Sequence, residues 1–531
     1  MALLKNNNEG GDTIMALNRK IKTLEEFIVE LKKLRNSGKK IIHCHGVFDL
    51  VHIGHIRHFS IAKALGDILV VTITPDQYVN KGPGRPVFTE ALRAEYIAAL
   101  EPVDYVIINN WPTAVEIIKA IKPDVYVKGQ DYADSEKDET GGIHCEREAV
   151  ESAGGKIHFT GDITFSSSSL LNEYFDIYPR EAQDFLAGFR KKYSAEKVIE
   201  MLKSLKSMKV LIIGETILDK YLFMAPMMGR PLKGNHIAAR TIGEETHAGG
   251  ILACANHLAN FCGNVDLITA IGNNGNEEFV RAHLKSNINL QLFYHDVAPT
   301  IVKRRFIETS FRSKLFEEYI LDDRPSPELD EKIMSYLRGI PRDLVYDLIL
   351  VLDYGHGLIT PRQIDFLCNQ RFDFLAVNAQ TNTANMGFNL ITKYPRANYF
   401  CLDDIELRLA FHDNYSESAK IITRLADRAS SSRAYMSRAV AVTLGHLGSM
   451  VYDAKKNELC KAPVLSQKIV DTTGAGDAFF ALTAPCVAKG FSMDLVAFIG
   501  NAAGALAVGY LGNQKSIEAT PFFKFITALL K

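Results

Sequence analysis

His52 and His55 carry the first candidate chemistry in this 531-residue chain, because their spacing places two imidazole donors on the same side of the backbone. Gly54 lies between them, and the surrounding pattern predicts a strand that runs into a loop and then a helix that begins here. A helix start offers free N–H groups and the positive end of the helix dipole. The arrangement therefore predicts a phosphate site.

A metal site is the alternative interpretation, because His43, His45 and His58 lie in the same stretch, HCHGVFDLVHIGHIRHF. The stretch lacks carboxylate or cysteine ligands at the spacings familiar from metal sites, and H-x-x-H alone is a weak signature. His43 and His45 share one face of a predicted strand, where they either pack or ligate. We expect these three histidines to be structural and His52 and His55 to be the catalytic pair.

A second candidate site follows a strand-like run, in the segment DTTGAGDAFFA. Gly474, Ala475 and Gly476 keep the backbone uncluttered, so that successive N–H groups can converge on an anion at a helix start. Asp477 comes next and is a candidate base for a hydroxyl that attacks a γ-phosphate. Neither a P-loop G-x-x-x-x-G-K-[ST] nor a strand-linked G-x-G-x-x-G is present, which disfavours other nucleotide-binding folds.

The elements that must position these residues alternate along the chain. Short apolar runs alternate with amphipathic helical segments, a pattern that predicts parallel sheets with helices on both faces. The fold class is therefore α/β, with two doubly wound domains. The expected organisation is a flexible tail at 1–17, a first domain at 18–178, a helical linker at 179–207 and a second domain at 208–531.

Composition excludes several classes of partner. The formal net charge is −1, so no field of one sign points to nucleic acid or to an anionic membrane surface. The eight cysteines form no C-x-x-C pair, which disfavours a zinc knuckle and a disulfide framework. Neither a signal-peptide core nor an apolar run of about 18 residues is present, and we expect a cytoplasmic protein.

The first domain resembles the nucleotidyltransferase superfamily of cytidylyl- and adenylyltransferases. The likeness starts with G-x-F-D-x-x-H-x-G-H and continues through GRPVFTEALRAEYIAAL, PDVYVKGQDY and FSSSSLLN, in that order. It is strongest toward the adenylyltransferase half of the bifunctional heptose-7-phosphate kinase/heptose-1-phosphate adenylyltransferases. The nucleotide- or phosphate-binding residues that it implies are Gly46, Phe48, Asp49, Gly54, Arg93, Lys128, Asp131, Ser166, Ser167 and Ser168.

This resemblance implies the transfer of a nucleotidyl group from ATP or CTP to a sugar 1-phosphate, with loss of pyrophosphate. The nucleophile is already an anion, so catalysis consists of positioning and charge neutralisation. His52 and His55 would contact the triphosphate, Lys63 and Arg93 would add positive charge, and Mg²⁺ is implied because it accompanies triphosphates. ATP and CTP both stay open as the nucleotide.

The second domain resembles the ribokinase-like sugar kinases, whose signature D-T-x-G-A-G-D the segment at Asp477 matches. The resemblance implies that Asp477 is the catalytic base, Asp219 a ligand of a sugar hydroxyl, Asn501 a neighbour of the adenine and Glu406 an indirect ligand of Mg²⁺. The remaining implied residues are Gly249 and Gly250 on the sugar side and Thr443, Gly445, Gly448, Gly474, Ala475 and Gly476 on the nucleotide side.

Three positions depart from that family. Ala253 stands where many relatives have Asn, Asn378 stands where the heptose kinases have the Asp of an Asp-Pro-Lys-Gly turn, and Asp403 begins an N-x-x-E-like motif that keeps Glu406. The kinase segment at Asp477 is intact, so phosphoryl transfer remains chemically feasible, while the altered sugar-side positions leave the sugar open.

The two resemblances together imply a bifunctional enzyme that makes a nucleotide sugar, such as the ADP-heptose precursor of lipopolysaccharide, with its halves in the reverse of the usual order. Its partners would be a nucleoside triphosphate and a sugar phosphate such as heptose 7-phosphate or heptose 1-phosphate, and both families suggest a homodimer. The alternative is a CTP-dependent cytidylyltransferase acting on another phosphate, with the kinase half reduced to a regulatory module that binds a sugar phosphate.

Overall fold

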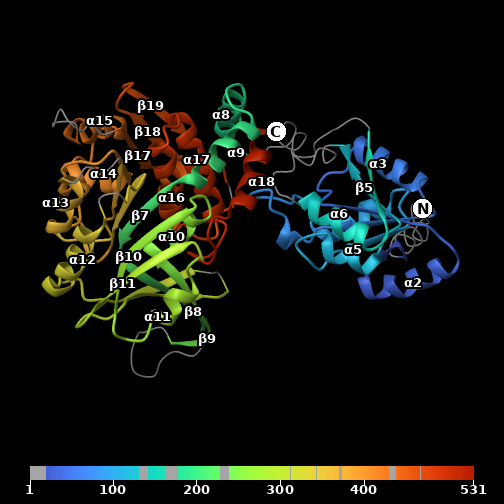
Figure 1. Cartoon of the computed structure of the whole chain (residues 1–531), viewed down its shortest axis with the longest axis horizontal. Coiled ribbons are helices and arrows are strands. Elements are labelled where there is room, and N and C mark those ends of the chain that lie inside the picture. Colours follow the sequence, from blue (N-terminus) through green and yellow to red (C-terminus); the bar gives the residue numbers. More distant parts are fainter. Residues whose placement is uncertain are drawn as a thin grey trace, which may run out of the picture. The chain divides into compact units, whose positions relative to one another are not determined.

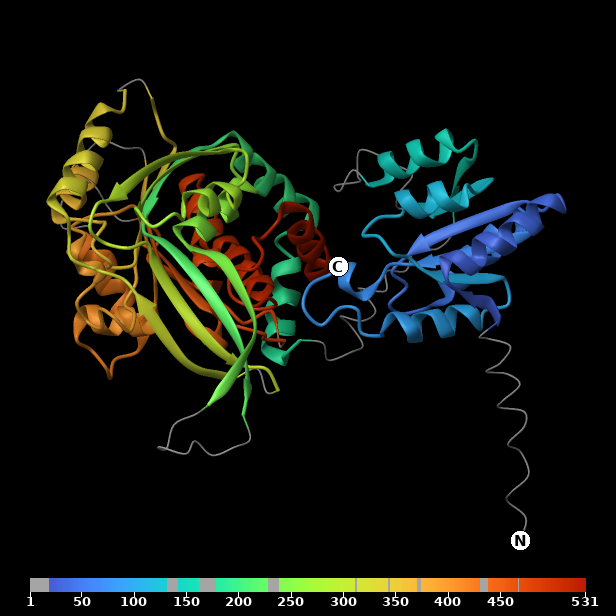
Figure 2. The same ribbon diagram turned by 90° about the horizontal axis from the view of Figure 1, so that it is seen from below.

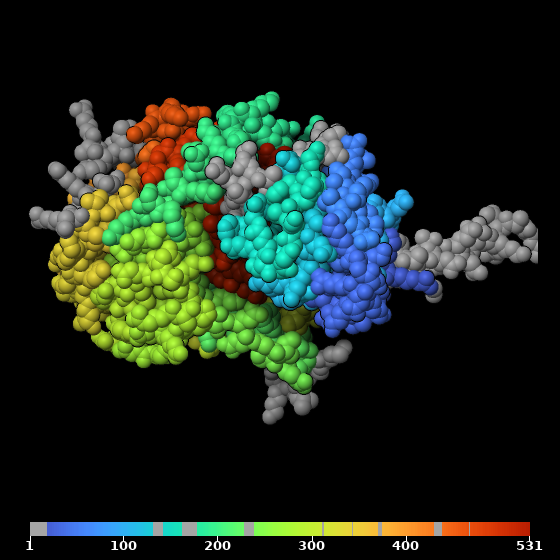
Figure 3. Space-filling view, turned by 45° about the vertical axis from the view of Figure 1, so that its right-hand side comes forward, coloured from blue at the N-terminus to red at the C-terminus, as the bar shows by residue number. Residues whose placement is uncertain are grey.

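The computed structural model describes residues 19–130, 142–161, 178–227, 238–310, 313–341, 344–369, 374–429, 438–466 and 468–531. The chain divides into two units. Unit 1 comprises Met1–Pro179 together with Phe523–Lys531, and unit 2 comprises Arg180–Phe522. In Figure 1 and Figure 3 the colour runs along the chain, so that most of unit 1 is blue to cyan and unit 2 runs from green to red.

Unit 1 is built on one six-stranded sheet in the order β1-β4-β3-β2-β5-β6, in which every neighbouring pair is parallel. Its strands are β1 (Ile21–Lys22), β2 (Ile41–Gly46), β3 (Ile68–Ile73), β4 (Tyr105–Ile108), β5 (Val125–Gly129) and β6 (Lys156–Thr160). The chain moves from β2 outward to β4 and then returns to place β5 on the other side of β2. Ligands of doubly wound folds bind at the carboxyl ends of the strands where this reversal occurs.

Helices cover both faces of this sheet, as its apolar strands require. They are α2 (Leu24–Asn36), α3 (Ile53–Ala64), α4 (Glu90–Ala98), α5 (Val115–Ile121) and α6 (Gly142–Ser152), with a short 3₁₀ turn, η1 (Asp76–Tyr78). Phe59 of α3 and Ile97 of α4 pack into one core cluster, whereas Phe27 of α2 and Ile117 of α5 pack into another. The two clusters fix the sheet between two helical layers.

Unit 2 has a nine-stranded sheet in the order β11-β10-β7-β14-β15-β16-β17-β18-β19. Its strands are β7 (Lys209–Gly214), β10 (Asn264–Gly272), β11 (Ile288–His295), β14 (Leu348–Asp353), β15 (Leu375–Ala379), β16 (Tyr399–Asp403), β17 (Ala439–Thr443), β18 (Ser449–Asp453) and β19 (Glu458–Ala462). The sheet is parallel up to β17, and the last two strands are antiparallel. The strand order reverses between β7 and β14, as it does between β2 and β5 in unit 1.

A separate four-stranded sheet, in the order β13-β12-β8-β9, leaves the main body directly after β7 (Figure 2). Its strands are β8 (Thr216–Pro226), β9 (Ala239–Gly250), β12 (Ile301–Glu308) and β13 (Ser313–Ile320). These strands could not be separated from the main sheet on the sequence alone. Hydrophobic periodicity indicates that a segment is a strand but does not indicate which strands it pairs with. In addition, β8 follows β7 after a single residue, Glu215.

The helices of unit 2 lie on both sides of the nine-stranded sheet (Figure 1). They are α8 (Arg180–Arg190), α9 (Ala195–Lys203), α10 (Ile251–Ala259), α11 (Glu277–Ala282), α12 (Pro327–Gly339), α13 (Pro361–Asn369), α14 (Asp404–Phe411), α15 (Ser418–Ala429), α16 (Ala475–Ala488) and α17 (Met493–Ala507), with 3₁₀ turns η4 (Ser204–Ser207), η5 (Ile391–Lys393) and η6 (Gly445–Leu447). The last helix, α18 (Ala519–Leu530), crosses the boundary between the units.

The segment expected as a linker forms α8, α9 and η4, and it packs on α17 within unit 2. The ring of Phe189 stacks on that of Phe498 with centroids 4.3 Å apart, and Lys192 pairs with Asp494 at 3.2 Å. This segment is therefore part of the surface of unit 2.

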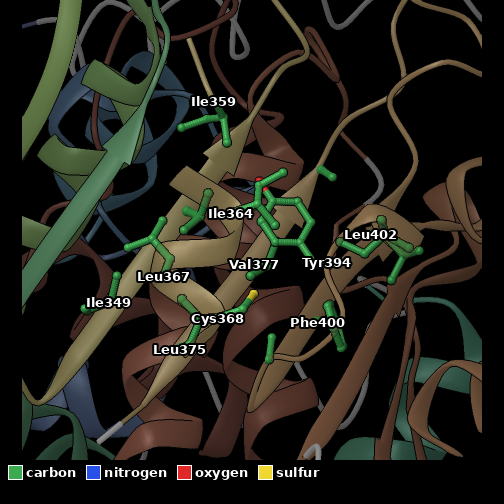
Figure 4. Close-up of a cluster of buried hydrophobic side chains, with 14 of the residues drawn as sticks. Ile349, Ile359, Ile364, Leu367, Cys368, Leu375, Val377, Tyr394, Phe400 and Leu402 are labelled. Carbon is green, nitrogen blue, oxygen red and sulfur yellow. The ribbon is translucent and has the colours of Figure 1, made fainter. Parts of the chain in front are cut away.

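The core beneath the second site is formed by the parallel strands β14, β15 and β16 (Figure 4). Val377 and Phe400 on the strands pack with Ile364 and Leu367 of α13, and each of these side chains is buried. Tyr394 ends this cluster and donates its hydroxyl to Asp353 Oδ2 at 2.6 Å. The core thus anchors the carboxyl ends of these strands, where polar residues begin.

The prediction of two doubly wound α/β domains is confirmed by these two sheet topologies. Among the described residues, no helix has the length and apolar character required to cross a membrane.

Candidate active sites

The first candidate site lies at the reversal point of unit 1, where β2 ends and α3 begins. His52 is the N-cap of α3, and its Nδ1 accepts a hydrogen bond from the Gly54 N–H at 3.2 Å. The His52 N–H donates in turn to His55 Nδ1 at 3.4 Å, and the two rings stack with centroids 3.9 Å apart. The sequence-predicted pair therefore forms a capping box, a role that Ser, Thr and Glu usually fill.

These contacts determine the protonation of both rings. Because each Nδ1 accepts a backbone N–H, the single proton of each neutral ring is on Nε2. Burial lowers the pKa of His55 to about 3, and it also lowers the pKa of His52. The His55 ring additionally bonds to the backbone of Leu50. Near neutral pH the pair consists of N–H donors without positive charge.

The other three histidines, which we expect to be structural, contact hydroxyl groups of neighbouring strands. His43 Nε2 and His45 Nδ1 each lie 2.8 Å from the same hydroxyl, that of Thr72 on β3, and His58 Nδ1 lies 2.9 Å from the Thr160 hydroxyl on β6. Burial lowers the pKa of His43 to about 3 and that of His58 to about 4. Within the described ranges, no group of three or more His, Cys, Asp or Glu residues is arranged to hold a metal.

The loop between β2 and α3 is held in one shape by its own residues. A Cβ on Gly46 would lie 2.8 Å from the tip of the Phe48 ring, so glycine lets this ring pack against the end of β2. Phe48 adopts a positive φ of 50°, and the buried Asp49 accepts the N–H groups of Val87 and Phe88 at 2.7 and 3.2 Å. These three predicted residues thus build the loop that presents His52.

Arg93 was expected to bring charge to the triphosphate, and the structure buries it completely. Its guanidinium donates to the carbonyls of Phe88 and Thr74 at 3.0 and 2.8 Å and to Asp76 Oδ1 at 2.6 Å. It therefore ties together the loops that follow β2 and β3. Contact between Arg93 and a nucleotide stays a prediction.

Lys63 and Lys128 are also paired with protein acids. Lys63 donates to the Asp104 carboxylate, and Lys128 Nζ lies 2.9 Å from Glu146 Oε2. Lys128 lies at the carboxyl end of β5, beside the end of β2, whereas Lys63 lies in the last turn of α3. Their roles in charge neutralisation stay predictions. Four further predicted residues, Asp131, Ser166, Ser167 and Ser168, lie outside the described residues.

The second candidate site is a cavity of about 650 Å³ in unit 2, between the carboxyl ends of the main strands and the four-stranded sheet. Its walls include Asp403 at the end of β16 and Lys303 on β12. The sequence-predicted residues that line it are Asp219, Gly250, Glu406, Thr443, Gly445, Gly448, Gly474, Ala475, Gly476, Asp477 and Asn501. The structure thus brings together segments that lie almost 300 residues apart in the chain.

Asp477 lies in the first turn of α16 and is almost fully buried. Its Oδ1 accepts hydrogen bonds from the Tyr354 hydroxyl at 3.1 Å and from Gln380 Nε2 at 2.9 Å. Burial raises its pKa to about 6, and these two hydrogen bonds oppose the increase. Asp477 is therefore ionised near neutral pH and basic enough to accept a proton.

The backbone before Asp477 forms an anion cradle. Gly474 has a φ of 83°, and a Cβ there would lie 2.2 Å from the Asn513 side chain, so only glycine fits. Gly474, Ala475 and Gly476 line the cavity. The Ala475 N–H donates to the Thr472 carbonyl at 3.3 Å, and the other N–H groups in the first turn of a helix have no helical acceptor. This geometry suits a phosphate group.

Asp219 on β8 marks the other end of the cavity. Arg305 on β12 donates to Asp219 Oδ1 at 2.6 Å, and Asn513 Nδ2 donates to Oδ2 at 3.1 Å. A Cβ on Gly249 would lie 2.0 Å from Asp219 Oδ2, so this glycine makes room for the carboxylate without lining the cavity. The predicted sugar-side residues therefore form one cluster together with Arg305.

Glu406 and Asp403 form a capping box at the start of α14. Glu406 accepts the N–H groups of Thr381 and Asp403 at 2.9 and 2.8 Å, and its own N–H donates to Asp403 Oδ1 at 2.7 Å. Burial and the neighbouring Asp403 raise the pKa of Glu406 to about 8. Both residues line the cavity, as the residues of the anion cradle do.

The nucleotide side is shaped by the turn between β17 and β18. Gly448 has a φ of 89°, and a Cβ there would lie 2.1 Å from the Ala462 carbonyl. Asn501 on α17 donates to the Ser449 hydroxyl at 2.8 Å and to the Ala462 carbonyl at 3.1 Å. Asn501 thus fixes the turn that carries Thr443, Gly445 and Gly448.

The positions that depart from the kinase family lie in or beside this cavity. Ala253 is buried in α10, outside the cavity lining. Asn378 lines the cavity and donates to the Cys401 carbonyl at 2.8 Å, whereas its buried Oδ1 has no hydrogen-bond partner among the described residues.

Polar residues of the cavity wall that were not singled out from the sequence include Lys303, Arg305, Tyr354, Gln380 and Asn513. Lys303 and Arg305 alternate on one strand, and Tyr354 and Gln380 each directly follow a buried parallel strand, so strand periodicity could have singled out these four. Asn513 follows α17 in a loop and carries no such signal.

Two family models match different parts of the chain. Residues 43–201 match the family model described as cytidylyltransferase-like, and residues 392–520 match the model described as pfkB family carbohydrate kinase. The bifunctional protein HldE of Sulfurimonas denitrificans is 46% identical over 114 residues, which are 21% of this chain and 24% of that protein. HldE of Citrifermentans bemidjiense is 36% identical over 156 residues, 29% and 31% of the two chains. The chain thus spans less than a third of the length of these curated relatives.

Similar solved structures include phosphofructokinase-2 from Escherichia coli, with a TM-score of 0.47 and 13% identity over 61% of this chain and all of that one. A ribokinase from Thermotoga maritima has a TM-score of 0.44 and 17% identity over 60% of this chain and 99% of that one. On the two family matches, the chain carries an N-terminal cytidylyltransferase-like domain followed by a C-terminal domain of the pfkB carbohydrate kinase family.

Proposed function

We propose that this chain is a bifunctional enzyme of nucleotide-sugar synthesis. Its C-terminal domain phosphorylates a sugar phosphate with ATP, and its N-terminal domain transfers a nucleotidyl group to a sugar 1-phosphate. The observation that carries the proposal is Asp477, a buried and basic carboxylate placed directly after an anion cradle in a cavity of about 650 Å³. The phosphorylated substrates lead us to propose a cytoplasmic location as well.

In the kinase half, Asp477 accepts the proton of the attacking hydroxyl. The new bond forms between that oxygen and the γ-phosphorus, the bond from the γ-phosphorus to the bridging oxygen breaks, and ADP leaves. The N–H groups at the start of α16 face the transferred phosphoryl group, where they stabilise the charge that develops. This is the reaction for which a base with a pKa of about 6 is suited.

The sugar end of the cavity favours an anionic sugar. Lys303 and Arg305 both line it, and Arg305 forms ion pairs with Asp219 and Glu317. Burial lowers the pKa of Lys303 although the nearby carboxylates of Asp219, Asp477 and Glu317 oppose the decrease, so a further anion at this position would favour the charged amine. A phosphate on the sugar would supply that anion, in agreement with the resemblance to kinases of heptose 7-phosphate.

In the nucleotidyltransferase half, an oxygen of the sugar 1-phosphate attacks the α-phosphorus and pyrophosphate leaves. This nucleophile is already ionised, so the site needs no base, and the described residues around His52 and His55 supply donors. The neutral His52 ring, which carries its proton on Nε2, can donate to a phosphate oxygen at the start of α3, whereas the His55 ring already donates to the Leu50 backbone and holds this arrangement. The resemblance to heptose-1-phosphate adenylyltransferases makes ATP and heptose 1-phosphate the first substrates to test.

Mg²⁺ fits the donor set of the kinase cavity. Asp403 and Glu406 both line the cavity, and Mg²⁺ prefers hard oxygen ligands of this kind, often through water. The ion would favour the ionised form of Glu406, against the burial and the neighbouring Asp403 that raise its pKa. When bound, the ion neutralises charge on the phosphate oxygens. The backbone N–H groups that Glu406 accepts would hold its carboxylate in place for that role.

Two assays test the proposal. The first follows pyrophosphate release from ATP or CTP with Mg²⁺ and a panel of sugar 1-phosphates, and we expect release with ATP and heptose 1-phosphate. No release with any sugar 1-phosphate would refute the nucleotidyltransferase half. The second follows ADP formation from heptose 7-phosphate by the wild type and by Asp477→Asn. Equal rates would show that Asp477 is not the base, and inactivity of both would favour a regulatory sugar-phosphate module.

A further inference from the structure

Two side chains hold the same oxygen of Asp477. The Tyr354 hydroxyl and Gln380 Nε2 both donate to Oδ1, at 3.1 and 2.9 Å. Tyr354 directly follows β14 and Gln380 directly follows β15, so the carboxyl ends of two adjacent parallel strands converge on one carboxylate oxygen. All three residues line the cavity.

This asymmetry distinguishes the two carboxylate oxygens. An amide NH₂ group can only donate, so Oδ1 is committed as an acceptor by Gln380 whatever the orientation of the tyrosine hydroxyl. Within the described parts of the chain, Oδ2 of Asp477 receives no hydrogen bond from another residue. Because Oδ1 accepts both hydrogen bonds, Oδ2 is the oxygen better placed to take up a proton from a substrate.

The asparagine-rich loop after β15 holds both donors in place. Asn382 and Asn385 each donate to the Tyr354 carbonyl at 2.7 Å. Asn389 donates to the Gln380 carbonyl at 3.0 Å and to the Asp353 carbonyl at 2.9 Å. We call these three residues the asparagine clamp.

The clamp accounts for part of the departure from the family pattern. The stretch NAQTNTANMGFN replaces the Asp-Pro-Lys-Gly turn of the heptose kinases, and its amides bond to the ends of β14 and β15. In a degenerate loop we would not expect three separate side-chain amides to bond to the backbone of the two residues that contact Asp477. The replacement is thus an alternative scaffold for the base.

We propose that Gln380 and Tyr354 are positioning residues that assign proton transfer to Oδ2 of Asp477, and that the asparagine clamp holds them for this purpose. The inference rests on the proposed kinase function. It concerns the hydrogen bonds that orient Asp477, so it can be refuted even if the protein is an active kinase.

Other groups that face Asp477 must remain constant in a test of this idea. They come from every element packed around it and are Lys303 on β12, Asp219 on β8, Glu406 on α14, Cys254 on α10, Cys401 on β16 and Tyr354 itself. Replacement of Gln380 leaves all of these unchanged. A change in the pKa of Asp477 after replacement of Gln380 can therefore be attributed to one hydrogen bond.

The test replaces Gln380 by Met, which keeps the length of the side chain and removes the donor. We expect kcat for ADP formation to fall about tenfold or more, while KM for the sugar phosphate and for ATP stays within about twofold. The acidic limb of kcat/KM should move up by about one to two pH units, because a hydrogen bond to the ionised form no longer favours it. Gln380→Glu adds a second signature, because a glutamate can donate only when protonated, and its activity should fall as the pH rises.

The matched control is Gln363→Met, which makes the same change at another buried glutamine of unit 2. Gln363 lies on α13, outside the cavity, and bonds to Asp330 Oδ1 at 3.0 Å. A purely structural effect would lower the melting temperature in both variants and leave the acidic limb where it is in the wild type.

A readout without turnover separates the inference from the proposed function. The Asp477 carboxyl can be titrated by ¹³C NMR of protein labelled at the aspartate carboxyl carbons, with Asp477→Asn to assign the signal. A higher pKa in Gln380→Met supports the inference even if the wild type forms no ADP, a result that would refute only the kinase proposal. An unchanged titration together with an unchanged acidic limb in folded Gln380→Met would overturn the inference.

Discussion

The His52 N–H donates to His55 Nδ1, and the two rings stack with centroids 3.9 Å apart. Each histidine therefore uses one ring nitrogen to build the start of α3 and keeps its proton on the other. The pair combines a structural role, as a helix cap, with a proposed chemical role, in which the His52 ring donates its N–H to phosphate. The two roles use different atoms, so substitutions can separate them.

His52→Asn is the substitution that separates them. Asparagine is among the best N-caps and keeps an acceptor for the Gly54 N–H, so the melting temperature should change by no more than a few degrees. It lacks the Nε2–H donor, so pyrophosphate release should fall about 100- to 1,000-fold. His58→Asn on the same helix serves as the control and should leave turnover within a few fold. A similar loss in both variants would contradict a specific role for His52.

Acid should destabilise unit 1 between pH 6.5 and about 4. Burial lowers the pKa of His43 to about 3, so this ring stays neutral in the fold and protonates near pH 6.5 when unfolded. The unfolded state then binds more protons below pH 6.5, and stability is lost as the pH falls. The loss should reach about 2 kcal/mol at pH 5 for this histidine alone.

Calorimetry from pH 7.5 to pH 5 checks this expectation. His43→Gln removes the titrating ring, so the dependence of the unit 1 transition on pH should become shallower than in the wild type. An equal slope in both proteins would show that His43 does not contribute to it.

Both candidate sites could be proposed from the sequence because each lies where a strand-like segment runs into a helix. His52 and Asp477 each belong to the first turn of such a helix or to its cap, and residue type and spacing reveal those positions. The strand orders could not be derived, because apolar periodicity reports that a strand is buried without naming its neighbours. The four-stranded sheet that carries Lys303 was missed for the same reason.

The sequence also could not predict which charged side chains of the sites are available to a ligand. Arg93 reads as a free cation in the chain, yet it is buried and donates to Asp76 and to two carbonyls of separate loops. A sequence motif shows which residue type is present. Whether the charge of that residue is available to a ligand depends on its partners in the folded structure. Gln380 is the opposite case, a residue that contacts a site residue without belonging to a motif. Its neighbours in the sequence do not indicate that its side chain reaches Asp477.

Lys303 should determine the preference for a phosphorylated sugar. Its buried amine faces the sugar end of the cavity, so Lys303→Met should raise KM for the sugar phosphate about 10- to 100-fold, the worth of one charge-assisted hydrogen bond. KM for ATP should change little. Steady-state kinetics with each substrate varied in turn measure both values.

The control for Lys303 is Lys332→Met on α12, an exposed lysine paired with Asp296 at 3.3 Å. This variant should retain the wild-type KM for the sugar phosphate. If Lys303→Met alters KM for ATP and leaves KM for the sugar unchanged, the orientation of the substrates in the cavity is the reverse of the one proposed.

Asp477→Asn should abolish kinase turnover and stabilise unit 2 at the same time. Asn keeps an oxygen for the Tyr354 and Gln380 donors and cannot accept the substrate proton. The pKa of Asp477 is raised to about 6, so the carboxylate disfavours folding once it ionises, and stability is lost as the pH rises from about 4 through 6. The variant lacks this penalty, which is on the order of 3 kcal/mol at pH 7.5.

Melting temperatures of the wild type and Asp477→Asn, measured from pH 4 to pH 8, check the sign of the effect. The advantage of the variant should be largest above pH 6 and should vanish near pH 4, where the wild-type carboxyl is protonated in both the folded and the unfolded state. If the melting temperature of the variant exceeds that of the wild type by the same amount at every pH, the substitution acts through packing. The ionised carboxylate of Asp477 would then not destabilise the fold, as we expect of a buried general base.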